Sequence, residues 1–204
     1  MYDIRWEEEP EVEEYRRLDA LFKVDAEKAL SGFEALAARG SVASMLYLAG
    51  EYRIGGPSVL QDLNKAKYWY EKAEQKGAPP VSYMLGVVCS QLIQYDKAFA
   101  AFSRGAARNY LPAIYRLAML HHDGLGTSTD INRCRTLLEL AASRGHLFAK
   151  RDLATLFLRG RFGPRLMMRG ISMLAGLLFN IIGFCLKSVR RGPQAVIFDE
   201  RILA

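Results

Sequence analysis

Two kinds of amphipathic segment alternate along the chain. In the first kind, apolar residues recur every three or four positions, at 44–56, 81–92, 113–126 and 149–163. The second kind has a similar period and occupies residues 25–40, 62–77, 94–109 and 130–145. This period indicates α-helices with one buried face. The pattern predicts an all-α protein built from helix pairs, which we denote helix A and helix B in each pair.

The helix B segments share one frame. Each carries a base at the same place, and the frame continues into a fifth segment: Lys28, Lys65, Lys97, Arg133 and Arg169. The bases are 37, 32, 36 and 36 residues apart. An aspartate precedes the base by three residues, where an N-cap accepts free backbone N–H groups, at Asp25, Asp62 and Asp130. A residue suited to the left-handed helix end follows twelve residues after the base, at Gly40, Gly77, Gly145 and Asn109.

The helix A segments also share a frame. A leucine recurs at one position, at Leu48, Leu85, Leu117 and Leu153. The next residue is always small, namely Ala49, Gly86, Ala118 and Ala154. A small residue beside a leucine at helical spacing lets a neighbouring helix approach closely. We therefore expect these positions to be structural.

These two frames resemble the Sel-one-like repeat family, a relative of the tetratricopeptide repeats. The first set of matching residues is Leu48, Tyr52, Gly55, Asp62, Lys65, Ala66, Trp69, Tyr70, Ala73 and Gly77. The second set is Ala113, Leu117, Gly124, Gly126, Asp130, Ala141, Ala142 and Gly145. The resemblance covers about residues 25–165 and implies a right-handed α-solenoid that binds proteins, often as an assembly adaptor in signalling or at the bacterial envelope.

The stretch HHDGLGTSTD, residues 121–130, has the composition of a ligand site. In the repeat frame, however, Gly124 and Gly126 turn the chain from helix A to helix B, followed by polar residues that favour turns. A phosphate loop would need a preceding strand and a Gly-Lys-Ser/Thr ending. His122 and Asp123 lack the spacing of a metal site, so we expect no metal and assign them either to plain structure or to a contact in a groove.

A binding groove is expected where helix A positions face inward. The residues assigned to it are Arg53, Tyr83, Gln91, Tyr115, Met119, His122, Asp123, Arg151 and Arg159. Tyrosine and arginine often anchor protein interfaces, which favours a protein partner. The alternative is that these side chains only pack against neighbouring helices. No catalytic motif such as GxSxG or HExxH occurs, so we expect neither an enzyme nor a small-molecule substrate.

Residues 166–191 are apolar and flanked by bases. Seventeen residues, Gly170 to Leu186, carry no charge, which is short for a membrane span of about 20 residues. The candidate membrane or anion contacts are Arg161, Arg165, Arg169, Lys187, Arg190 and Arg191. The segment is helix B of a fourth pair, a membrane-associated helix or a contact for a membrane protein. These readings remain open, and the first two are compatible.

Charge differs between the two ends. Residues 1–20 contain eight acids and three bases, whereas residues 150–191 contain nine bases and one acid. After Pro10, an acidic helix is expected to cap the array, with Leu18, Leu21 and Phe22 on its inner face. Three widely spaced cysteines argue against a disulfide framework. The acidic N-terminus does not resemble a secretory signal, so we expect a cytoplasmic location, either peripheral to or anchored in the inner membrane.

The sequence thus predicts four parts: a capping segment (1–24), a repeat array (25–165), a hydrophobic helix (166–191) and a tail (192–204). The predicted fold is an α-solenoid of about four Sel-one-like helix pairs. The predicted function is a non-catalytic adaptor that binds protein in the helix A groove and contacts the membrane through its C-terminal helix. The alternative is a soluble regulatory subunit whose hydrophobic helix is buried in an oligomer interface. We expect no cofactor and no nucleic-acid partner, because the bases lack interleaved aromatic platforms.

Overall fold

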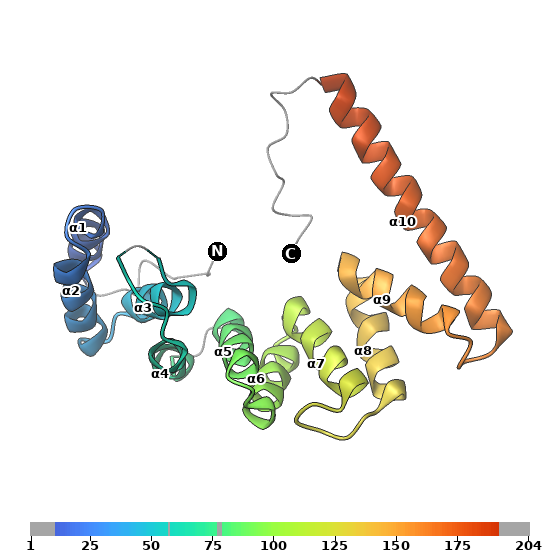
Figure 1. Cartoon of the computed structure of the whole chain (residues 1–204), viewed down its shortest axis with the longest axis horizontal. Helices are drawn as coiled ribbons and strands as arrows, with labels where there is room; N and C mark the ends of the chain where they lie inside the picture. The colour runs from blue at the N-terminus through green and yellow to red at the C-terminus, as the bar shows by residue number, and fades with distance from the viewer. Residues whose placement is uncertain (1–10, 57, 77–78, 192–204) are drawn as a thin grey trace. The chain divides into compact units, whose positions relative to one another are not determined.

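A computed structural model describes residues 11–56, 58–76 and 79–191, and within these ranges the regular secondary structure is helix alone (Figure 1). The chain forms two compact units, Met1–Tyr110 and Leu111–Ala204. The first contains α1 (Val12–Phe22), α2 (Ala26–Ala38), α3 (Val42–Ile54), α4 (Leu63–Glu74), α5 (Pro79–Gln91) and α6 (Tyr95–Ala107). The second contains α7 (Leu111–Asp123), α8 (Ile131–Ser143), α9 (Leu147–Leu158) and α10 (Pro164–Arg191). Consecutive helices pack on one another within each unit, as in an α-solenoid.

The helix boundaries follow the predicted caps. Asp25 accepts a hydrogen bond from the backbone N of Lys28 at 3.1 Å, and Asp130 accepts one from Arg133 N at 2.9 Å. Asp62 accepts from the backbone N of Asn64 and of Lys65. After α8 the chain reverses at Gly145, whose φ of 98° favours glycine. Gly77, predicted to end α4, lies outside the described residues.

The predicted leucine frame lies in the core of both units. Leu48 and Leu85 are buried in the first unit, and Leu117 and Leu153 are buried in the second. The small residue that follows allows close packing, as Gly86 illustrates. A Cβ placed on Gly86 would lie 2.6 Å from the ring of Phe102 on the next helix. Size at this position is therefore limited by the neighbouring helix.

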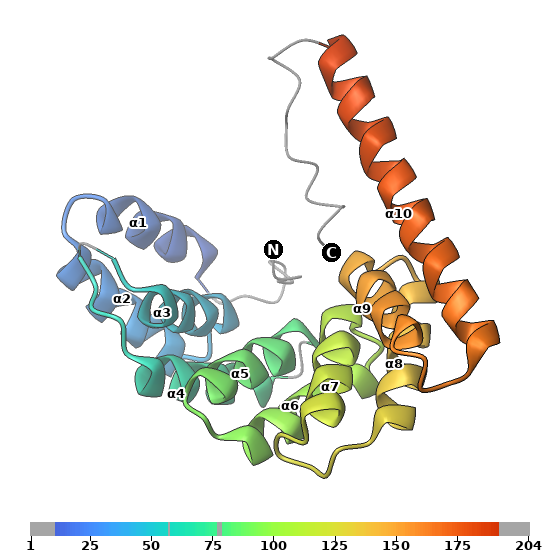
Figure 2. The same ribbon diagram turned by 45° about the vertical axis from the view of Figure 1, so that its right-hand side comes forward.

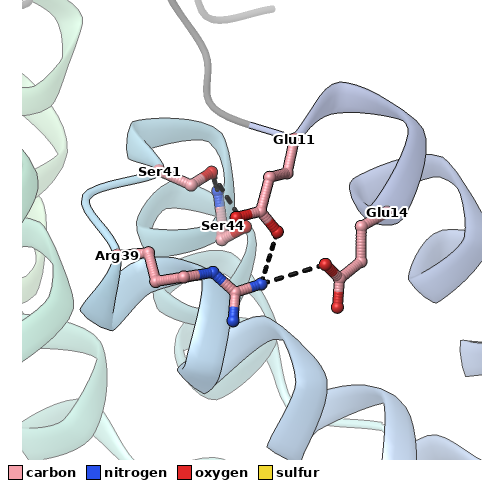
Figure 3. A network of polar contacts seen from close by, with 5 residues as sticks. All are labelled: Glu11, Glu14, Arg39, Ser41 and Ser44. Carbon is pink, nitrogen blue, oxygen red and sulfur yellow. Dashed lines mark hydrogen bonds and ion pairs between the residues drawn. The ribbon is translucent and has the colours of Figure 1, made fainter.

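Helix α1 covers the start of the array through its apolar side. Leu18 packs over Gly32 of α2, and Tyr15 meets Phe33 with ring centroids 5.3 Å apart. At the edge of this contact, Arg39 binds Glu11 at 2.6 Å and Glu14 at 3.0 Å (Figure 3). These observations confirm the predicted capping helix. The acidic residues before Glu11 lie outside the described residues.

The loop between α7 and α8 is a turn. Gly124 and Gly126 have φ values of 70° and 68°, and the backbone N of Asp130 donates to the carbonyl of His121 at 2.8 Å. A Cβ on Gly124 would lie 2.6 Å from the Thr129 hydroxyl, so the loop closes on itself. The glycines therefore act as the repeat frame predicts.

Helix α10 packs on its neighbour along only part of its length. Its 28 residues span about 42 Å at 1.5 Å per residue, far longer than α9. Its first turns pack on α9 as helix B of a fourth pair, and its C-terminal half extends past α9 (Figure 2). Pro164 occupies the first helical position, which tolerates the missing N–H. The predicted tail, residues 192–204, lies outside the described residues.

Candidate functional site

A candidate binding face lies on α7 and α9 in the second unit. It surrounds a cavity of about 120 Å³ formed by three helices. Its lining residues are Met119, His122, Cys134, Leu138, Asp152, Thr155, Leu156 and Arg159. Three of these, Met119, His122 and Arg159, belong to the groove predicted from sequence. We call the cavity together with the side chains that surround it the α7–α9 face.

One end of the α7–α9 face is organised around Asp152. The Tyr115 hydroxyl donates to Asp152 Oδ2 at 2.8 Å, and Arg151 Nε donates to Asp152 Oδ1 at 2.7 Å. The carboxylate therefore holds one aromatic and one cationic side chain at once. Burial and the bond to Asp152 raise the pKa of Tyr115 to about 12, so its hydroxyl remains a neutral donor.

Aromatic packing fixes the same end. The Tyr115 ring stacks on His146 with centroids 4.7 Å apart and an interplanar angle of 27°. His146 is buried, and its Nδ1 accepts from the backbone N of Ala149, which makes it the N-cap of α9. Beside it, the exposed ring of Phe148 lies 5.3 Å from the Arg151 guanidinium carbon. The exposed Phe148 and Arg151 side chains thus lie beside the buried His146.

At the other end of the α7–α9 face, three side chains are linked by polar contacts. Arg159 Nη1 lies 3.2 Å from His122 Nε2, and His122 Nδ1 lies 2.6 Å from Asp123 Oδ1. Because arginine can only donate, Nε2 accepts, and the proton of the neutral ring sits on Nδ1 and points at Asp123. His122 is thereby held between a base and an acid. In the part of the chain that the structure describes, no group of three or more His, Cys, Asp or Glu side chains could hold a metal.

The nearby thiol has the features of a packing residue. Cys134 is fully buried on α8, at the position where the repeat frame places alanine. Burial raises the pKa of its thiol to about 11, so the sulfur stays protonated at neutral pH. A protonated, buried thiol is a poor nucleophile. The chemistry of the α7–α9 face is therefore that of hydrogen bonding, charge and aromatic contact.

Six of the nine residues assigned to the groove meet on the α7–α9 face: Tyr115, Met119, His122, Asp123, Arg151 and Arg159. The remaining three lie in the first unit. There Tyr83 packs against Phe102 and Tyr110, with ring centroids 5.9 Å and 5.6 Å away, while Gln91 is exposed and Arg53 half-buried. A groove that joins the two units stays a prediction.

Sequence reasoning missed Asp152 and Phe148. The hydrogen bonds between Tyr115 and Asp152 and between His122 and Arg159 each join residues 37 positions apart, whereas the ring contact of Tyr115 with Phe148 joins residues 33 positions apart. The repeat frame aligned residues 36 positions apart, so it paired Tyr115 with Arg151 and overlooked the adjacent carboxylate. A search for complementary side chains one position beyond the repeat would have found it.

The candidate membrane contacts lie at both ends of α10. Arg161, Arg165 and Arg169 are exposed, and the Arg169 guanidinium carbon lies 5.6 Å from the Phe157 ring centroid. Lys187, Arg190 and Arg191 belong to the last turns of the helix. A cavity of about 350 Å³ lies beside the α9–α10 contact, and Glu139, Lys150 and Arg169 are among its lining residues. Among the described residues, no helix reaches the length and apolarity of a membrane span.

Comparison with known proteins agrees with the geometry. The sequence model of the Sel1 repeat matches residues 42–77 and 111–146, which correspond to α3–α4 and α7–α8. The chain is similar to c5321, a protective antigen of uropathogenic Escherichia coli strains that displays an SLR fold. The TM-score is 0.65 at 23% identity, and the match covers 78% of this chain and 36% of that one.

A second similar structure is a Sel1 repeat protein from Oxalobacter formigenes. Its TM-score is 0.62 at 24% identity, and the match covers 74% of this chain and 46% of that one. The matched region thus spans less than half of either relative, and at this identity the likeness concerns the fold alone. Together with the repeat matches, it shows an α-solenoid in which residues 42–77 and 111–146 match the Sel1 repeat.

Proposed function

We propose that this protein is a non-catalytic adaptor that binds a protein partner on the α7–α9 face and rests against a membrane through α10. Sel1 repeats are protein-interaction scaffolds, which supports the general class. The observation that carries the proposal is the hydrogen-bonded arrangement of Tyr115, Asp152 and Arg151 beside the exposed Phe148. Aromatic and arginine side chains that are already held in place lose little freedom on binding.

The charge of this face indicates the kind of partner. Arg151 and Arg159 are exposed there, whereas the carboxylate of Asp152 already accepts from two donors and that of Asp123 is paired with His122. We therefore assign the face to a segment that offers both acidic and aromatic or aliphatic side chains. Acidic groups would pair with the arginines, and apolar groups would cover Phe148 and Met119.

Site-specific photo-crosslinking in cells tests this assignment. A photoreactive residue at Thr155, on the face, should capture a partner that the same residue at Thr136 does not. Thr136 is a close match because both threonines are exposed and each hydroxyl donates to the carbonyl four residues earlier at 3.0 Å. Equal capture at both positions would contradict a specific face.

A double variant adds a second criterion. Phe148→Ala/Arg151→Ala should reduce crosslinking from position 155 by about tenfold or more, as expected for loss of two interface anchors. The control Leu140→Ala/Arg133→Ala removes the same kinds of exposed side chain from α8 and should leave capture unchanged. A partner that tolerates the first variant would have to bind elsewhere on the protein.

A further inference from the structure

One face of α10 packs against α9. Gly170 is buried, and a Cβ placed there would lie 2.8 Å from the Ala154 carbonyl oxygen and 3.0 Å from Phe157 Cβ. Leu166 and Met173, on the same side of the helix, are half-buried. This close approach fixes the rotation of α10 about its own axis, and so determines which of its residues point away from α9.

The opposite face is an exposed apolar stripe. It consists of Met168, Ile171, Ala175, Leu178, Phe179 and Ile182. Leu178, Phe179 and Ile182 are 60%, 77% and 56% exposed. Steps of three and four residues keep such a row on one side of a helix. Large apolar side chains that are contiguous and open to water mark an interaction surface.

The charges beside the stripe are all positive. Arg165 is exposed and lies on one flank of it, about 90° from its centre by helical rotation. Arg169 lies further round, at about 130°, with its guanidinium carbon 5.6 Å from the ring centroid of Phe157 on α9. The sequence adds Lys187, Arg190 and Arg191 at the end of the same helix. Residues 153–198 contain no aspartate or glutamate. Glu139 of α8 lines the cavity that Arg169 also lines, on the side of α10 that faces α9. On α10 itself, the charges beside the stripe are therefore all cations.

This charge pattern favours an anionic lipid surface over a second copy of the chain as the partner of the stripe. If two copies paired through their stripes, the cations of each helix would face those of the other, with no acid on either side to form the flanking ion pairs of a coiled coil. An anionic lipid surface offers what both features require. Acyl chains accept the apolar row, and headgroup phosphates accept the arginines.

We infer that α10 lies in the plane of an anionic membrane surface, with the stripe of Met168 to Ile182 inserted among the lipids and Arg165 on their phosphates. This inference rests on the membrane half of the proposed function and specifies the helix face and the lipid class. It requires no crossing of the bilayer. The α7–α9 face is on other helices of the same unit and is free to bind protein.

Flotation of the full-length protein with vesicles tests the inference. Vesicles of phosphatidylcholine with 30 mol% phosphatidylglycerol should bind the protein at least tenfold more tightly than vesicles of phosphatidylcholine alone. Leu178→Ser/Ile182→Ser should abolish most of this binding. The control Ile54→Ser/Leu60→Ser changes one isoleucine and one leucine that are 65% and 88% exposed in the first unit, and should bind as the unchanged protein does.

A substitution at Arg165 tests the contribution of the charged flank to vesicle binding. Arg165→Gln should weaken binding to the anionic vesicles by roughly fivefold, in line with the contribution of one cation near such a surface. It should leave the weak binding to neutral vesicles unchanged. Equal binding to both vesicle types, or no effect of the stripe variant, would overturn the inference.

Two further results separate the alternatives. If the chain dimerises in light scattering without lipid, and Leu178→Ser/Ile182→Ser makes it monomeric, then a second copy occupies the stripe and the inference is wrong. Crosslinking from position 155 is scored on the same variant. Loss of vesicle binding with retained crosslinking supports separate lipid and protein surfaces, whereas the adaptor proposal fails only if crosslinking shows no specificity.

Discussion

The first and last helices of the described chain, α1 and α10, differ in the side chains that they expose. Helix α1 buries Leu18 against α2 and turns charged residues outward, including Glu13 and Arg17. Helix α10 buries Gly170 against α9 and turns apolar residues outward, among them Leu178 and Phe179. A terminal helix of a solenoid needs a polar outer face to be stable in water. Helix α1 meets this requirement, whereas α10 does not, which indicates that the second end is built to be covered.

The strongest test of this comparison is a bulky residue at the α9–α10 contact. Gly170→Leu should destabilise the second unit by about 3 kcal/mol, because the new side chain would meet the backbone of Ala154 and cannot be relieved by a rotamer change. Urea denaturation followed by circular dichroism measures the effect.

The matched control lies further along α10. Gly176 has nothing within 4 Å of a Cβ placed on it, so Gly176→Ala should stabilise the protein by roughly 0.5–1 kcal/mol through helix propensity. Equal effects of the two substitutions would mean that α10 does not dock on α9 through Gly170.

Truncation of one leucine at each end gives the next largest difference. Leu18→Ala should cost about 2 kcal/mol, because the side chain is 9% exposed and its loss leaves a cavity over Gly32. Leu178→Ala should change stability by less than about 0.5 kcal/mol in the absence of lipid, because that side chain is 60% exposed. Thermal denaturation of both variants measures the contrast. A large loss for Leu178→Ala would show that the stripe is already covered.

Lowering the pH should have a smaller effect on folding stability, and this effect should arise in the second unit. All three histidines lie there, at His121, His122 and His146. Burial lowers the pKa of His146 below its usual value near 6.5, so the unfolded chain binds this proton more tightly. Stability is then complete above about pH 6.5 and decreases as the pH falls through the folded-state pKa.

The variant His146→Asn isolates this contribution. Asparagine keeps an oxygen that can cap Ala149 but does not titrate, so the decrease in melting temperature between pH 7.5 and 5.5 should become shallower. It should not vanish, because burial also lowers the pKa of His121. An unchanged pH dependence would show that His146 is not the group responsible.

The sequence predicted what depends on local pattern. The caps Asp25, Asp62 and Asp130 and the turn at Gly124 are each specified by a few neighbouring residues, and the structure places them as expected. The partnership of Tyr115 with Asp152 could not be predicted in the same way. This contact depends on the position of α9 along the axis of α7, which is determined by tertiary packing. Likewise, the apolar length of residues 166–191 left open which of their sides would face α9, and the close contact at Gly170 decides it.

The smallest expected effect concerns the ion pairs that join α1 to α2. Hydrogen bonding between the two carboxyl groups lowers the pKa of Glu11 and raises that of Glu14, with Arg39 beside both. All three side chains are more than 40% exposed, so solvent screens the attraction. Arg39→Ala should therefore shift the melting temperature less than any substitution above, and less still at 0.5 M salt. If Arg39→Ala instead matched Leu18→Ala, charge rather than apolar burial would hold α1 in place, and the contrast between the two ends would rest on electrostatics.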